Sequence, residues 1–132
     1  MDNRELLEIA ENARKFSYSP YSKFRVGAAV LTEGGKVFTG CNIECASFGG
    51  TNCAERVAVF KAVSEGHRDI AKIAISSDNS EEDKQIFPCG ICRQVIFEFG
   101  MDIKIVTGYS KGKVFEYGIG ELLPHSFTGD DF

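Results

Sequence analysis

Two short segments carry the side chains that could do chemistry. Cys53 and Glu55 stand two residues apart with Arg56 next, and a Cys89-x-x-Cys92 pair follows further along the chain. Thiolates are soft ligands that suit zinc, and three protein ligands leave a fourth position that water can occupy. A spare carboxylate beside that position suits proton transfer, first as a base and then as an acid. The pattern predicts one zinc ion per chain, bound by the three cysteines, with Glu55 as the catalytic group.

Other interpretations of the cysteines remain open at this point. A Cys-x-x-Cys pair alone is also typical of redox motifs and of structural zinc sites. A redox motif should follow directly from a strand, whereas an acidic loop and Pro88 precede this pair. A structural site needs a fourth ligand, which Cys41 or Cys45 could supply. That alternative leaves Glu55 without a role.

Length and composition predict a single domain covering residues 1–132. The chain is 43% hydrophobic and 26% charged, as is ordinary for a soluble globular protein. Its five cysteines are an odd number, which argues against a complete disulfide framework. The charged N-terminal residues lack the apolar core of a signal peptide, and no stretch approaches the length of a membrane span. We therefore expect a cytoplasmic protein with reduced thiols and no membrane partner.

The charge balance bears on the kind of substrate. The formal net charge is −4, and the lysines and arginines are scattered along the chain rather than gathered in a run. Proteins that bind nucleic acid usually present a basic patch or stripe. The sequence therefore argues against a polynucleotide substrate.

Hydrophobic periodicity and turn residues predict an alternation of helices and strands. Helices are expected up to about Phe16, over 53–64 and over 88–99, and strands over 26–32, 37–41, 71–76, 103–107 and 113–117, with a polar loop over 78–84 and a helical turn over 119–123. This order is typical of a three-layer α/β domain. The helices that begin at the two cysteine segments should pack side by side on the sheet. Since the helix over 53–64 is apolar on most faces, we expect it to be buried.

The positions of the cysteines at helix starts make a geometric prediction. Cys89 and Cys92 lie three residues apart and should share one face of a helical turn. Cys53 and Glu55 are two apart and would not face each other inside a helix, so Cys53 must sit at the cap. Free amides and the positive dipole end at helix starts favour thiolates. Arg56 could offset the negative charge of three thiolates by hydrogen bonding to sulfur.

With these residues in place, the chain resembles the cytidine deaminase family, whose zinc-site signature is a known pattern. The likeness spans nearly the whole chain and rests on six segments, at residues 20–24, 26–29, 39–44, 53–56, 88–94 and 121–124. It implies an α/β/α sandwich with a five-stranded mixed sheet. It also implies a homotetramer with shared active sites, which hydrolyses free cytidine and 2′-deoxycytidine to the uridines with release of ammonia, a reaction of pyrimidine salvage.

The resemblance also implies roles for residues outside the metal site. Asn42 and Glu44 match positions that hold the ribose 3′-hydroxyl, although the residues alone suggest an ordinary turn there. Phe24 matches an aromatic residue of the pyrimidine pocket, and the backbone of Ala54 is expected to contact the pyrimidine carbonyl. Phe127 matches a residue that a neighbouring subunit contributes.

Three positions depart from the family pattern. Cys45 stands where asparagine is common, Phe48 where tyrosine is common, and Phe87 where serine usually precedes the proline. The loop before Pro88 is also longer than usual. These differences leave the metal site intact and bear on substrate preference. Two alternative functions therefore stay beside the leading one: deamination of a related aminonucleoside, and a zinc-stabilised binding protein without activity.

Overall fold

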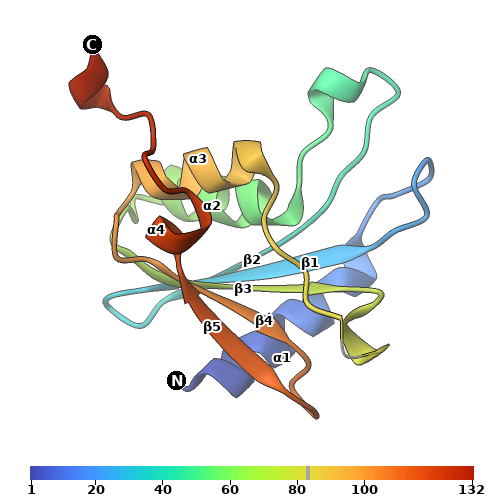
Figure 1. The fold of residues 1–132 in the computed structure, drawn as a ribbon. Helices are drawn as coiled ribbons and strands as arrows, with labels where there is room; N and C mark the ends of the chain where they lie inside the picture. Colours follow the sequence, from blue (N-terminus) through green and yellow to red (C-terminus); the bar gives the residue numbers. More distant parts are fainter. Residues whose placement is uncertain (83) are drawn as a thin grey trace.

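The computed structural model describes residues 1–82 and 84–132 and is built on a five-stranded sheet (Figure 1). The strands are β1 (Val26–Thr32), β2 (Val37–Cys41), β3 (Ile70–Ser77), β4 (Lys104–Gly108) and β5 (Val114–Gly118), in the order β2-β1-β3-β4-β5. β3 and β4 are parallel, and the other neighbours are antiparallel. The predicted mixed sheet is confirmed. Residue 83, inside the predicted polar loop over 78–84, lies outside the described residues.

Helices cover both faces of this sheet, which gives the expected three layers. α1 (Asn3–Ala13) lies on one face, and α2 (Ala54–Ser64) and α3 (Gly90–Glu98) lie side by side on the other (Figure 1). The short α4 (Ile119–Leu122) follows β5. Alternation along β1 divides the core, because Ala28 and Val30 join the cluster under α2 and α3 while Ala29 joins the cluster under α1.

Local sequence explains where α1 begins and how closely it approaches the sheet. The Asp2 carboxylate accepts a hydrogen bond from the amide of Glu5 at 2.8 Å, a normal N-cap contact. The regular helix ends at Ala13 and tightens into a 3₁₀ turn that reaches the predicted end at Phe16. Gly27 permits close packing of α1 on β1, because a Cβ atom there would lie 2.1 Å from the carbonyl oxygen of Ala10.

The second close approach positions the start of α2. A Cβ atom on Gly40 of β2 would lie 2.5 Å from the carbonyl oxygen of Ala54 and equally close to the amide nitrogen of Ala58. The first turns of α2 therefore rest directly on β2 because residue 40 has no side chain.

The expectation that α2 is buried on most faces is only partly correct. Ala58, Val59 and Ala62 are fully buried against the sheet, whereas Phe60 on the outer face is 47% exposed. The sequence pattern showed that this helix is apolar, but it did not show what covers the outer face of the helix. Across residues 1–82 and 84–132, no helix combines the length and the apolar character needed to cross a membrane.

Candidate active site

The two cysteine segments lie at helix starts, as the spacing requires. Cys53 is the N-cap of α2 and has extended backbone angles, so Glu55 falls at the second helical position. Cys89 is the N-cap of α3, and Cys92 stands in its first turn. The predicted cap position of Cys53 is confirmed. Because both caps are cysteines, neither side chain caps its own helix by a hydrogen bond, and the sulfurs are left for another partner.

The three sulfurs fit a zinc ion. The Sγ atoms of Cys53, Cys89 and Cys92 all lie within 4.8 Å of one another, and those of Cys53 and Cys89 are 3.7 Å apart. Tetrahedral thiolates at a Zn–S bond length of ~2.3 Å are about 3.8 Å apart. A disulfide would need about 2.05 Å, and all five cysteines are free thiols. Cys41 and Cys45 do not belong to this cluster, so the structural four-cysteine alternative is not supported.

The electrostatics of the cluster also favour a cation. Hydrogen bonding from Cys92, together with the guanidinium of Arg56, lowers the pKa of Cys53 to about 5. The same contact with Cys53, together with burial, raises the pKa of Cys92 above its ordinary value. Cys92 therefore gives up its proton less readily than Cys53 does, and a bound cation would favour the thiolate form. Arg56 donates to the sulfur of Cys53 at 3.5 Å, as its predicted role requires.

The loop before Cys89 is fixed from three directions. The hydroxyl of Thr107, at the end of β4, donates to the carbonyl of Ile86 at 2.8 Å and accepts from its amide at 3.1 Å. The ring of Phe87 packs edge-on against Tyr117, with centroids 5.3 Å apart. The Arg93 side chain donates to the carbonyl of Pro88 at 2.7 Å. These contacts hold a ligand that lies outside any regular element.

A cavity of about 310 Å³ adjoins the sulfurs. Its wall contains two of the cysteines, Cys53 and Cys89, and the predicted catalytic residue Glu55. It also contains four of the five predicted substrate-binding residues, namely Phe24, Asn42, Glu44 and Ala54. Glu55 is only 4% exposed, and burial raises the pKa of its carboxyl to about 7. The cavity thus combines a metal-ligand cluster, a buried proton-carrying group and an apolar wall large enough for a small ring.

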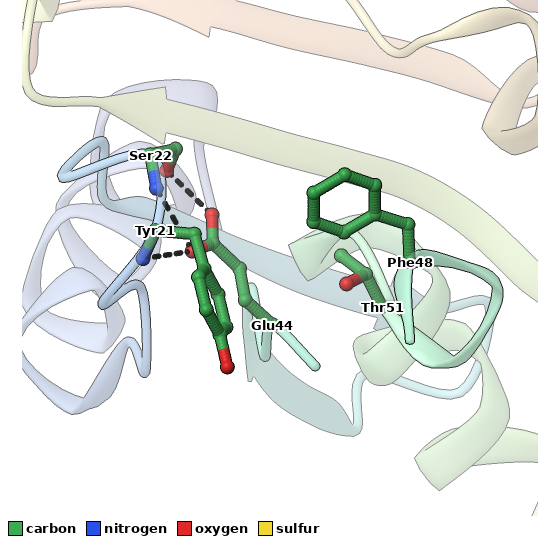
Figure 2. Close-up of a pocket in the computed structure, with 5 residues that line it drawn as sticks. All are labelled: Tyr21, Ser22, Glu44, Phe48 and Thr51. Atoms are coloured by element: carbon green, nitrogen blue, oxygen red, sulfur yellow. Dashed lines mark hydrogen bonds between the residues drawn. The ribbon is translucent and has the colours of Figure 1, made fainter. Parts of the chain in front are cut away.

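Asn42 and Glu44 are already engaged with the protein. The Asn42 side chain accepts from the amide of Val26 at 2.9 Å and donates to the carbonyl of Phe24 at 2.8 Å. The Glu44 carboxylate accepts from the backbone of Tyr21 and Ser22, in a second cavity that Figure 2 shows. Both side chains therefore hold the segment before β1 in place, a role that the sequence did not indicate.

One predicted site residue lies elsewhere. Phe127 is 56% exposed in the C-terminal tail, where its carbonyl accepts a hydrogen bond from Gln94 on α3. It lines a separate cavity beside α3 and not the cavity at the sulfurs. Conversely, the sequence did not single out Val26, Thr51, Asn52 and Ile86, which do line the site. Val26 belongs to the matching segment 26–29, and the other three were signalled only by their proximity to the quoted motifs.

Comparison with known proteins gives a consistent family. The family model described as the cytidine and deoxycytidylate deaminase zinc-binding region matches residues 1–108. A cytidine deaminase of Halalkalibacterium halodurans is 48% identical over 132 residues, covering 99% of this chain and 98% of that protein. The crystal structure of a cytidine deaminase from Burkholderia pseudomallei superposes with a TM-score of 0.87 at 44% identity, over 96% of this chain and 100% of that one.

A relative with a different named activity is more distant. A blasticidin-S deaminase of Bacillus cereus is 34% identical over 129 residues, covering 94% of this chain and 91% of that protein. Relatives that match nearly the whole chain therefore include a deaminase named for a different substrate.

Proposed function

The chain belongs to the cytidine deaminase family of zinc enzymes, and on that premise we propose that it deaminates free cytidine and 2′-deoxycytidine. The products are uridine or 2′-deoxyuridine and ammonia, with one water consumed. The observation that carries this proposal is the single cavity that holds Cys53, Cys89 and the buried Glu55 beside an apolar wall. The net charge of −4 favours a free nucleoside over a polynucleotide.

The metal would be held by Cys53, Cys89 and Cys92. When bound, zinc supplies a Lewis acid that makes a water molecule nucleophilic near neutral pH. Glu55 takes one proton from the attacking water and carries it to N3 of the pyrimidine. It then takes the second proton from the hydroxyl group added at C4 and passes it to the amino group, which leaves as ammonia while the C4 carbonyl forms. Arg56 stays hydrogen-bonded to the sulfur of Cys53 and offsets the negative charge of three thiolates.

The remaining cavity residues would bind and orient the nucleoside. Phe24 packs against the pyrimidine ring, and the backbone of Ala54 contacts the pyrimidine carbonyl. Asn42 and Glu44 hold the ribose 3′-hydroxyl through the hydrogen-bonding capacity that their protein contacts leave over. The amide of Asn42 has one hydrogen without a protein acceptor among the described residues, and this hydrogen can be donated to a sugar oxygen.

We further propose that residues 1–132 form one catalytic domain of a cytoplasmic homotetramer with shared active sites. Two features support the assembly. Phe60 leaves an apolar outer face on α2, and the tail bearing Phe127 extends away from the body beyond α3 (Figure 1). The cytoplasmic location is supported by thiols that must stay reduced to bind the metal.

Mixing variants tests whether the sites are shared. Chains with Phe127→Ala and chains with Glu55→Gln should each be nearly inactive. Co-assembled, they should regain part of the activity, because a site with native Glu55 can then receive a native Phe127. Light scattering that finds a fully active monomer would contradict the proposed assembly.

A direct assay tests the activity itself. Purified protein should remove the absorbance of cytidine and release ammonia in equal amounts, and the same sample should contain one zinc per chain. No turnover by zinc-loaded protein would refute the proposal and leave a zinc-stabilised binding protein.

The second candidate is a deaminase of a related aminonucleoside, which the blasticidin-S deaminase relative favours. A substrate panel that includes cytidine and blasticidin S, followed by ammonia release, separates the two. Higher kcat/KM for the plain nucleosides is expected, because Asn42 and Glu44 line the cavity and suit a sugar hydroxyl.

A further inference from the structure

The hydroxyl of Ser22 donates a hydrogen bond to the carboxylate of Glu44. That carboxylate receives three hydrogen bonds from the segment before β1 (Figure 2). Its Oε1 atom accepts from the backbone amides of Tyr21 and Ser22 at 3.0 and 3.1 Å, and its Oε2 atom accepts from the Ser22 hydroxyl at 2.5 Å. The two oxygens are therefore held by different kinds of donor, and only the second depends on a side chain.

The hydrogen bonds to the Glu44 carboxylate occupy three of its acceptor positions. A carboxylate offers about four lone-pair sites, two on each oxygen. Oε1 uses both of its sites on backbone amides, and Oε2 uses one on the hydroxyl. Among the described residues, one acceptor position of this carboxylate therefore remains without a donor, on Oε2, the oxygen that the hydroxyl of Ser22 holds. These bonds also hold the pKa of Glu44 below its ordinary value, with the hydroxyl of Ser22 as the largest cause, so the carboxylate stays an acceptor.

The same hydroxyl reaches the aromatic residue of the site. It accepts a hydrogen bond from the amide of Phe24 at 3.1 Å. Lys23, between the two, has a φ of 59°, a left-handed turn that a side chain rarely adopts and that local hydrogen bonds must hold. Ser22 thus links the carboxylate expected at the sugar with the ring expected at the base, and it lines the cavity at the sulfurs and the second cavity next to it.

We propose that Ser22 is a positioning residue through which the enzyme recognises the 3′-hydroxyl of its nucleoside by a hydrogen bond. It acts through Glu44, by aiming the one free acceptor position of Oε2 at the sugar. This inference rests on the proposed function, since it assigns a determinant of sugar specificity to the same site. The reacting atoms are not involved, so the effect belongs in nucleoside binding rather than in the chemical step.

The test compares two nucleosides that differ only in the 3′-hydroxyl. Zinc-loaded parent and Ser22→Ala proteins are assayed for turnover of 2′-deoxycytidine and 2′,3′-dideoxycytidine, and calorimetry gives Kd for both. A hydrogen bond to a charged group is typically worth about tenfold in affinity. Ser22→Ala should raise KM and Kd for 2′-deoxycytidine about tenfold and change kcat less than about twofold. For the dideoxynucleoside, the KM and Kd of parent and variant should agree within about twofold, because this nucleoside has no 3′-hydroxyl to bind.

Conservative variants separate positioning from general damage. Ser22→Thr keeps the hydroxyl and should restore the parent preference between the two nucleosides. If Ser22→Ala folds poorly, Ser22→Cys keeps the side-chain size with only a weak donor and replaces it. An equal rise in Kd for both nucleosides, or no rise for either, overturns the inference. Absence of turnover by the parent refutes the proposed function instead, while the Kd ratio still decides the role of Ser22.

Discussion

Glu55→Gln is the substitution that bears most directly on the proposed chemistry. Glutamine keeps the size and shape of the side chain but cannot carry a proton. Among the described residues that line the cavity at the sulfurs, the only other carboxylate is Glu44, which three hydrogen bonds from Tyr21 and Ser22 already engage. Both histidines lie outside the residues that line this cavity. Within the described part of the chain, no other carboxylate or imidazole of this cavity is therefore free to replace Glu55.

The expected loss follows from the number of transfers that Glu55 makes. General acid–base catalysis by one group is worth about 10²–10⁴-fold. Because Glu55 serves the attacking water, N3 and the leaving amino group, we expect kcat to fall by about 10⁴-fold or more. The substitution lies two residues from Cys53 but removes no sulfur, so zinc content and nucleoside affinity should be retained.

The assay measures all three properties on one preparation. Loss of cytidine absorbance gives kcat, metal analysis gives zinc per chain, and calorimetry gives the affinity for cytidine. Glu44→Gln is the matched control, since it changes the other carboxylate of the cavity and should raise KM more than it lowers kcat. A Glu55→Gln enzyme that turns over cytidine within tenfold of the parent would show that another group moves the proton.

Three further changes test the metal, the packing and an ion pair. Cys89→Ser should abolish zinc binding, whereas Cys41→Ser should leave one zinc per chain, as metal analysis would show. Gly40→Ala should lower the free energy of unfolding by about 1–3 kcal/mol through overpacking against α2, whereas Gly49→Ala, where a Cβ atom meets open space, should leave the melting temperature nearly unchanged. Although burial opposes it, hydrogen bonding from Arg25 holds the pKa of Asp78 below 3.8. The pair therefore stabilises the fold above that pH, and the stabilisation is lost as the pH falls through the lowered pKa. Melting temperatures from pH 7 to pH 3 should consequently depend less on pH in Asp78→Asn than in the parent.

The sequence was most informative where spacing alone constrains geometry. The spacing of two positions from Cys53 to Glu55 requires a cap position, and the spacing of three positions from Cys89 to Cys92 requires one helical turn; both requirements are met. The strands at 26–32 and 37–41 were predicted with their observed bounds because glycines and a polar turn delimit them. These features depend on residues that are close in the sequence, and periodicity and turn residues indicate such local structure.

Long-range contacts explain what the sequence could not predict. The hydrogen bonds of Asn42 join it to the backbone of residues 24 and 26, and the Glu44 carboxylate meets a segment more than twenty residues away. Neither partner can be identified from spacing. The outer face of α2 shows the same limit, because an apolar pattern does not say whether the chain itself or another molecule covers Phe60. The placement of Phe127 away from the sulfurs likewise depends on the path of the tail.

The burial of Glu55 depends on a strand that carries no catalytic group. Cys53 can turn its sulfur toward Cys89 only from the cap, and this places the buried Glu55 in the first turn of α2. That turn lies close to the strand because Gly40 has no side chain. A displacement of α2 would therefore expose Glu55 to water and shift Cys53, while Cys89 and Cys92 on α3 would keep two of the three metal ligands in place. Gly40→Ala should consequently lower kcat more than it lowers zinc content, and the opposite order would mean that the helix start positions the metal ligands before it positions the carboxylate.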